Sequence, residues 1–353
     1  MSDYVTAINP ITLADYESLI TDPTSPRKKF LHTIRDYMPF FHNVPISMAD
    51  KGDTVEDQMI NVYPEGELHN DGEGWGDETV VGNTVKYTAC QRSSSNSIET
   101  RKLERRSGAE QDQWRLNRDE TFAIGFARAV VRDIFYGDPA KDSKVCKGFF
   151  NIVSPKNKAF KDRIINAGGK TADKQTEIAL IGWDPAYTFM FYPKKDKEQA
   201  KRNSAGFEVD VHEDPIRVSL ERDGKPKHFW AYETDFHWEY GLSIFDARSV
   251  VRITNLDTSL WTKVTMDASA PDLINILTQA YNMLPTERRG RCAFYMNDDV
   301  TSLLTRQIGE KSNAFWTPAD IKNGVKFDSF HGVPIIQFGT DVMTSSGAVV
   351  TGV

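Results

Sequence analysis

One stretch of the chain carries a clear helical pattern of apolar residues. Within residues 109–136, large apolar side chains recur four positions apart, at Phe122, Phe126, Val130 and Ile134. This spacing puts them on one face of an amphipathic helix, and Gly137-Asp138-Pro139 would end that helix. About 26 residues at ~1.5 Å each would extend ~40 Å, which is long for a globular helix. The pattern therefore predicts a spine along which other elements pack.

The second half of the chain alternates between strand and helix patterns. Two β-branched and aromatic runs, 216–222 and 227–240, flank Asp223-Gly224 and predict a hairpin. Further strands are predicted at 248–254, 292–296, 333–338 and 348–353. Helices are predicted at 271–284, with Ser269 as its cap, and from Thr317-Pro318 to Gly324. Asn297 is predicted to cap a third helix, whose apolar face contains Val300, Leu303, Leu304 and Ile308. One long helix with mixed sheets indicates the α+β class.

Charge is concentrated in two neighbouring stretches. Residues 50–78 contain ten Asp or Glu and one Lys, whereas residues 86–118 contain eight Lys or Arg and four Asp or Glu. Strand-like runs at 58–63 and 79–88 flank a glycine-rich tip, which predicts an extended hairpin with too few apolar residues for a core of its own. From charge alone, this arm is either a solvated loop or a projection that docks on a basic patch of a neighbouring subunit.

The composition is that of a folded protein without secretory or membrane features. Of 353 residues, 39% are hydrophobic, and the net charge of −7 argues against a nucleic-acid binder with a basic surface. Because no Lys or Arg precedes Arg27, we expect no secretory signal, and no apolar run reaches the ~18–20 residues of a transmembrane helix. Cys90, Cys146 and Cys292 are odd in number and far apart, which favours small buried side chains in a reducing cytoplasm over a disulfide framework.

No motif completes a catalytic, metal or cofactor site. Gly169-Lys170-Thr171 lacks the upstream glycine of a phosphate-binding loop, and His212-Glu213 lacks the second histidine of a zinc protease. Ser243 lacks the second glycine of a nucleophile elbow, and we interpret it as a strand residue. In strand 230–240, aromatic and charged residues alternate between the two faces. A carbohydrate hydrolase, the enzyme alternative, would need its acidic residues beside the aromatic rings, and this alternation separates them. We expect no enzyme, no cofactor and no metal, and core-facing rings at Trp230, Tyr232, Phe236, Trp238 and Tyr240.

Short motifs occur in a fixed order over nearly the whole chain. They are Pro10-Ile-Thr-Leu-Ala-Asp15, Asn61-Val-Tyr-Pro-Glu65, Ile134-Phe-Tyr-Gly-Asp138, Tyr240-Gly-Leu242, Asp246-x-Arg248-x-Val-Val-Arg-Ile253, Arg291-Cys-Ala-Phe-Tyr-Met-Asn297 and Phe330-His-Gly-Val-Pro334. In order and spacing, the motifs resemble those of the major capsid proteins of tailed bacteriophages, whose fold is typified by phage Hong Kong 97.

The resemblance implies a division of the chain into five parts. These are an N-terminal arm at 1–45, an extended loop or β-hairpin arm at 46–98, a peripheral domain with the spine helix at 99–170, an axial domain at 171–329, and C-terminal strands at 330–353 that close the axial and peripheral sheets. The loop at 194–206 is longer and more basic than the corresponding turn of relatives.

The resemblance also implies a role and a set of partners. The chain would self-assemble as hexamers and pentamers into the icosahedral head shell around the double-stranded DNA of a tailed phage, with an encapsulin-like shell protein as the alternative. Implied partners are a scaffolding protein, a portal, a cement or decoration protein, and packaged DNA bound without sequence specificity, with no membrane. We expect assembly in the cytoplasm of the host bacterium and a final location in the virion.

The two charged stretches predict a subunit interface. Opposite charges on identical subunits are self-complementary, and such pairs set register more than affinity. We expect acidic-tip residues of one subunit to meet basic residues of its neighbour; the candidates are Glu65, Glu67, Asp71, Glu73 and Trp75 on the tip and Arg101, Arg105 and Arg106 on the basic stretch.

Overall fold

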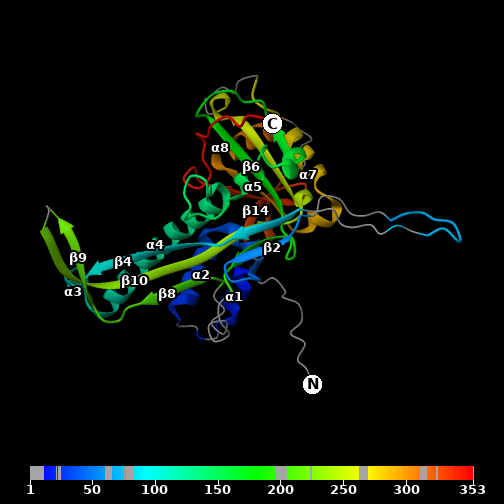
Figure 1. The fold of residues 1–353 in the computed structure, drawn as a ribbon. Helices are drawn as coiled ribbons and strands as arrows, with labels where there is room; N and C mark the ends of the chain where they lie inside the picture. The colour runs from blue at the N-terminus through cyan, green and yellow to red at the C-terminus, as the bar shows by residue number, and fades with distance from the viewer. Residues whose placement is uncertain are drawn as a thin grey trace.

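The computed structural model describes residues 12–20, 22, 25–59, 66–74, 76, 83–194, 205–222, 225–261, 269–310, 316–322 and 325–352. Its elongated half is built along the helix α4 (Gly108–Tyr136), which runs alongside the long strand β10 (Lys225–Ile244) (Figure 1). The Phe122 and Phe126 rings lie 5.2 and 6.2 Å from the Phe236 ring of β10. The helix predicted from the four-residue spacing is therefore confirmed, and its apolar face covers the sheet.

A six-stranded sheet forms the other layer of this half. Its main path is β1 (Ile46–Met48), β7 (Thr188–Tyr192), β10 and β4 (Cys90–Glu99), while β8 (Phe207–Val211) and β9 (Ile216–Arg222) also pair with β10. The β9–β10 pairing confirms the predicted hairpin, although residues 223 and 224 lie outside the described residues. The helices α1 (Leu13–Leu19) and α2 (Pro26–Tyr37) cover the same face, with the Phe30 ring 5.3 Å from that of Phe236.

An arm projects from the base of this sheet. Strands β2 (Thr54–Gln58) and β3 (Thr84–Thr88) pair antiparallel, from Thr54 opposite Thr88 to Gln58 opposite Thr84. Hairpin pairing is confirmed at the base of the arm, where Val55 and Tyr87 are buried. The first predicted strand, 58–63, overlaps β2 only at Gln58, and residues 60–63 and 79–82 of the predicted strands lie outside the described residues.

The second half contains a seven-stranded mixed sheet. Its order is β13 (Trp316–Lys322), β14 (Val325–Phe330), β15 (Val333–Phe338), β12 (Cys292–Asn297), β6 (Gln175–Gly182), β11 (Val250–Asp257) and β5 (Ile164–Asn166). The helices α7 (Leu273–Met283) and α8 (Asp298–Glu310) pack on it. Every residue of β6, β11 and β12 is buried, as expected for strands covered on both faces. Together the two halves confirm the α+β class.

Aromatic side chains join the two halves. The Phe40 ring lies 5.7 Å from that of Phe135 at the end of α4, and 5.8 and 5.5 Å from those of Trp183 and Tyr295. The indole Nε1 of Trp183 donates a hydrogen bond of 2.6 Å to the hydroxyl of Tyr295. This cluster belongs to the core that runs from α1 to β15, so the second sheet is anchored directly to the helix layer.

Several predictions made from the sequence are wrong. Residues 316–322 form the strand β13 instead of a helix, because pairing with β14 outweighs the helix-start preference of Thr317-Pro318. The side chain of Asp272, not Ser269, caps α7 by accepting a bond of 3.4 Å from Asn275 N. Residues 348–352 form no strand; the Val350 N–H donates instead to the Asn255 side chain, at 2.8 Å.

Candidate subunit-interface surfaces

The described residues of the acidic tip lie in solvent. Residues 66–74 and 76 are all exposed, and they include the predicted interface residues Glu67, Asp71 and Glu73. The Glu73 carboxylate accepts bonds of 3.0 and 3.3 Å from the backbone and side-chain nitrogens of Asn70, which closes a turn. Across the tip, Glu67 accepts a bond of 3.3 Å from Gly76 N. Glu65 and Trp75 lie outside the described residues.

The predicted basic residues surround the short helix α3 (Thr100–Glu104). Arg101 and Arg105 are exposed, and Arg106 is half-buried. The Arg106 guanidinium donates a bond of 2.7 Å to the Lys102 carbonyl oxygen. We call this group the α3 basic surface: Arg101, Lys102, Arg105 and Arg106.

An arginine–tryptophan stack extends the α3 basic surface onto α4. The guanidinium carbons of Arg106 and Arg118 lie 4.2 and 5.1 Å from the Trp114 ring centroid. At exposed sites a cation–π contact contributes about 0.5–1 kcal/mol, which favours this arrangement of the side chains. Sequence analysis missed the stack, although Trp114 and Arg118 are four residues apart on a predicted helix and their proximity could have been found.

Trp230 corrects the interpretation of the aromatic strand. Phe236, Trp238 and Tyr240 are buried as expected, whereas Tyr232 is only half-buried and Trp230 is 57% exposed. It lines a cavity of about 220 Å³ with Thr100, Arg101 and His228, beside α3. Trp230 lies near the start of β10, whereas the buried rings of this strand lie further along it, where α4 and α2 pack. The exposed indole adds an apolar side chain to a charged surface.

The acidic tip and the α3 basic surface lie at opposite ends of the subunit. Figure 1 shows the tip at the end of the projecting arm and α3 at the opposite side of the molecule, beyond α4 and β10. The fold therefore does not bring the predicted acidic and basic residues together within one chain. Any contact between them must join two subunits.

A groove separates the helix α4 from the edge strand β4. Its volume is about 530 Å³, with Phe122, Phe126 and Gly125 among its lining residues and Arg92 and Arg118 also contributing. Among the described strands, β4 pairs with β10 alone. Consequently, this face offers apolar, cationic and hydrogen-bonding groups side by side.

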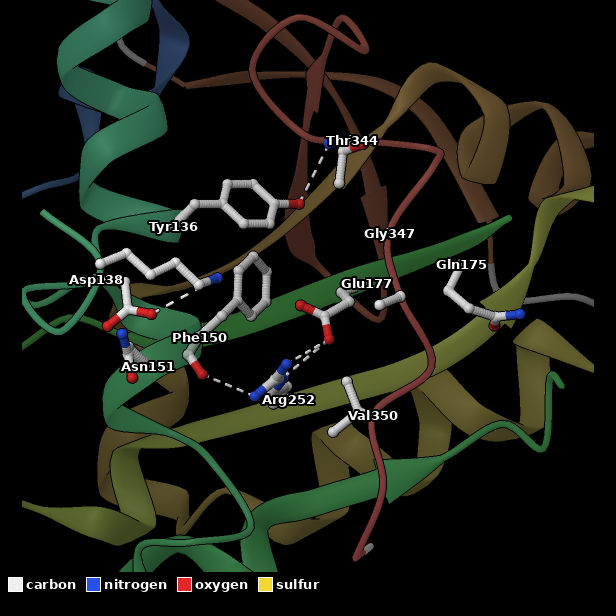
Figure 2. Close-up of a pocket in the computed structure, with 12 residues that line it drawn as sticks. Tyr136, Asp138, Phe150, Asn151, Gln175, Glu177, Arg252, Thr344, Gly347 and Val350 are labelled. Carbon is white, nitrogen blue, oxygen red and sulfur yellow. Dashed lines mark hydrogen bonds and ion pairs between the residues drawn. The ribbon is translucent and has the colours of Figure 1, made fainter. Parts of the chain in front are cut away.

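A second cavity, of about 350 Å³, lies where α4, β6, β11 and the C-terminal segment meet. Figure 2 shows Arg252 between Glu177 and Phe150. The guanidinium Nε donates to Glu177 Oε1 at 3.2 Å, and Nη1 donates to the carbonyl oxygens of Phe150 and Val153 at 2.7 and 2.8 Å. Thr254 donates to the same carboxylate oxygen at 2.9 Å. The buried Arg252–Glu177 pair is thus fully hydrogen-bonded, and it links the second sheet to the segment after α4.

Two residues from the motifs considered in the sequence, Ser243 and His212, have hydrogen-bond partners within the fold. Ser243 is buried in β10, and its hydroxyl donates to the Phe189 carbonyl oxygen at 2.9 Å. His212 lies 3.1 Å from Asp235 on the exposed face of the sheet. Within the described residues, no three His, Cys, Asp or Glu side chains are grouped to hold a metal ion. None of the helices described there has the length and apolar character needed to cross a membrane.

The comparison with protein families decides the relationship. Residues 38–351 match the model of the family "Major capsid protein GP7". The chain belongs to this family. The match includes the arm, α4 and both sheets, and it begins directly after α2.

One solved structure, that of bacteriophage Epsilon15, supports the same fold. The structure of bacteriophage Epsilon15 is 22% identical, with a TM-score of 0.57 over 87% of this chain and 88% of that one. A capsid of bacteriophage JBD30 decorated with minor capsid protein trimers is 10% identical, with a TM-score of 0.42 over 94% and 95% of the two chains. The search of curated proteins finds no match.

Family membership gives the surfaces their context. As a major capsid protein, the chain builds a phage shell from copies of itself and is located in the virion. A shell subunit needs surfaces that are unsatisfied in isolation, because they are completed by identical neighbours. In the isolated subunit, the described residues of the acidic tip are exposed, and so are Arg101 and Arg105 of the α3 basic surface.

Proposed function

We propose that the acidic tip of one subunit docks on the α3 basic surface of its neighbour within the hexamers and pentamers of an icosahedral head. One observation carries the proposal: the two surfaces have opposite charge but lie at opposite ends of the subunit (Figure 1). A head-to-tail contact between different patches repeats around a ring until it closes. The same contact can therefore serve every subunit of a capsomer.

The charges of this contact act mainly on register and assembly rate. Exposed ion pairs contribute ~0–1 kcal/mol each, so no single pair would hold two subunits together. Complementary potentials accelerate encounter and disfavour wrong registers. The Arg106–Trp114–Arg118 stack supports this role because it restricts two of the cationic side chains before docking.

Charge reversal tests the contact. Glu65→Lys with Glu67→Lys turns attraction into repulsion, and we expect it to abolish shells at moderate salt in assembly reactions viewed by negative-stain electron microscopy. The matched control is Glu213→Lys with Asp214→Lys, an equal reversal at two exposed residues away from the tip. Normal shells from the tip variant would contradict the proposal.

A charge swap makes the test specific. Combining the tip variant with Arg101→Glu and Arg105→Glu restores opposite charges across the proposed contact. We expect this quadruple variant to recover shells that neither double variant forms. Loss of assembly in all three would instead indicate that the basic residues act elsewhere.

We infer that the remaining roles follow those of a tailed-phage head protein. Proposed partners are a scaffolding protein, a portal, a cement or decoration protein, and double-stranded DNA contacted without sequence specificity, after assembly in the host cytoplasm. The net charge of −7 supports weak DNA binding. The proposed parts keep their boundaries: arm 1–45, extended loop 46–98, peripheral domain 99–170, axial domain 171–329 and C-terminal strands 330–353.

We also propose that the chain catalyses no reaction. The family is one of structural capsid proteins, and Ser243, from the nucleophile-like motif, is buried with its hydroxyl committed to a backbone carbonyl. Incubation with oligosaccharides tests the enzyme alternative that the aromatic strand suggests. We expect no cleavage products by mass spectrometry, and product formation that survives repurification would refute the proposal.

A further inference from the structure

Two cysteines that are far apart in the sequence meet in the fold. Cys90 begins β4, opposite Tyr240 of β10, and Cys146 lies in the segment between α4 and α5 (Phe149–Ile152). Their two thiols interact with one another. Cys146 is 4% exposed and Cys90 is half-buried, and both are free thiols. The spacing that argued against a disulfide is thus no measure of their separation.

The strand and the segment that carry these cysteines are held by a polar cluster. Asp133, one turn before the end of α4, accepts a bond of 3.0 Å from Arg92 Nε and one of 2.6 Å from the Tyr240 hydroxyl. Arg92 is two residues from Cys90, and Tyr240 lies opposite Cys90 on the neighbouring strand. These bonds fix the start of β4 against the end of α4.

Cys146 is fixed from the other side by close backbone packing. Gly137 N donates to Asp133 O at 2.7 Å, and Gly148 N donates to Gly137 O at 2.9 Å. A Cβ atom at Gly137 would collide with the carbonyl oxygen of Cys146, so the two backbones are in direct contact. The segment that carries Cys146 therefore has little freedom to move away from Asp133 and Cys90.

We propose that Cys90 and Cys146 are an oxidative modification site, where a reversible intrachain disulfide forms when the protein leaves a reducing environment. The observation is that the Arg92–Asp133–Tyr240 cluster and the Gly137 backbone hold the two cysteine-bearing segments at the same end of α4, where the thiols interact. The inference is independent of the proposed docking of the acidic tip.

The reaction requires an oxidant, and a small-molecule disulfide such as oxidised glutathione suffices. The Cys90 thiolate attacks one sulfur of that disulfide, forming a mixed disulfide and releasing one glutathione thiolate. Cys146 then loses its proton and attacks the Cys90 sulfur, which expels the second glutathione. One S–S bond is broken and one is formed, and two protein thiols are oxidised while oxidised glutathione is reduced to two thiols.

The environment gives the two thiols different parts in this exchange. The interaction with Cys146 lowers the pKa of the Cys90 thiol, which is also the more exposed of the two. The interaction with Cys90, together with burial, raises the pKa of the Cys146 thiol. Since the thiolate is the nucleophile, Cys90 is the attacking residue and Cys146 the resolving one.

The bond would lock the root of the projecting arm. Cys90 comes two residues after β3, the second strand of the arm, and Cys146 follows the spine helix. Oxidation would join these elements covalently without crossing between subunits. An oxidised shell would hold its arms at their bases after release from the host.

Oxidation of the full-length protein tests the site. The folded chain is incubated with oxidised glutathione, then denatured and alkylated with iodoacetamide before intact-mass and peptide analysis. We expect the loss of two hydrogen atoms, a single alkylation at Cys292, and a peptide pair that joins Cys90 to Cys146. We also expect the apparent unfolding temperature to rise on oxidation and to return after reduction.

Matched variants distinguish the site from general thiol oxidation. Cys292 is buried, and its thiol donates to the Arg289 carbonyl oxygen at 3.1 Å, so Cys292→Ser should still form the Cys90–Cys146 bond. Cys90→Ser should form no intrachain bond and show no temperature shift on oxidation. Alkylation of all three cysteines in the oxidised wild type, stable glutathionylation of Cys90 without closure, or a bond that includes Cys292 would overturn the proposal.

Discussion

Arg252 and Glu177 show how burial changes the role of an ion pair. Arg252 is 5% exposed and uses its guanidinium on Glu177 and on two backbone carbonyl groups, so its charge is fully compensated. Arg128 and Asp341 also pair, at 3.1 Å, but both side chains are 52% exposed. Removing one partner of a buried pair leaves the other charge without a counter-charge and shielded from water.

Substitution of Glu177 should therefore be costly. We expect Glu177→Gln to lower the free energy of unfolding by about 3 kcal/mol, near the lower end for a broken buried pair, since the amide oxygen can still accept a bond. Urea unfolding of the unassembled subunit measures this. Asp341→Asn is the exposed control, with an expected loss of ~0–1 kcal/mol. Equal effects of the two changes would contradict the assignment.

Asp119 provides a pH-dependent test at the same scale. It is buried, and its carboxylate accepts bonds from the Asn96 amide at 2.6 Å and the Thr234 hydroxyl at 2.9 Å. Burial raises the pKa of Asp119 above its ordinary value. The stability that this group contributes is therefore fully present below its unfolded pKa and is lost as the pH rises through its folded pKa.

The variant Asp119→Asn keeps the side-chain shape but cannot ionise. Relative to the wild type, its free energy of unfolding should increase from about pH 4 towards neutral pH, because only the wild type must bury a carboxylate there. Urea unfolding over that pH range gives the difference directly. Parallel curves for the two proteins would show that Asp119 does not titrate as its burial indicates.

At the scale of elements, the helix α4 depends on how it ends. Gly137 follows the helix with φ −51°, a value that any residue can adopt, so conformation does not require glycine there. Space does, because an added Cβ would meet the carbonyl oxygens of Cys146 and Asp133. Gly125, inside the same helix, has no atom within 4 Å of an added Cβ.

Substitutions at these two glycines, one inside α4 and one directly after it, should thus change the stability in opposite directions. We expect Gly137→Ala to destabilise the subunit by about 1–3 kcal/mol through overpacking. Gly125→Ala should stabilise it by about 0.5–1 kcal/mol, because alanine loses less conformational entropy in a helix. Thermal unfolding of both variants beside the wild type measures the effects. Destabilisation by Gly125→Ala would mean that the groove beside β4 closes on this residue.

At the scale of the whole molecule, charge separation predicts a salt response. Exposed charges are screened over ~10 Å at 0.1 M salt and ~3 Å at 1 M, so docking of the acidic tip should weaken over this range. We expect light scattering to show slower assembly as sodium chloride rises. The variant Glu67→Gln with Glu73→Gln should assemble slowly and respond little to salt. Wild-type assembly that is indifferent to salt would contradict electrostatic docking.

The sequence alone determined the features that depend on local spacing. The four-residue recurrence of Phe122 and its neighbours was sufficient for α4, and the runs around Asp223-Gly224 were sufficient for the β9–β10 pair. Asn297 was recognised as a cap, and it accepts a bond of 3.0 Å from Val300 N. The order of short motifs also indicated the family. Each of these signals is complete within a few residues of chain, or in their order along it.

Tertiary structure decided what depends on distant partners. Residues 316–322 became a strand because β14 pairs with them, and Trp230 stayed exposed because it lies beyond the buried part of β10. The meeting of Cys90 with Cys146 and the separation of the acidic tip from α3 have no signature in spacing or composition. Pairing, burial and distance between remote segments are properties of the packed chain, so only the fold could decide them.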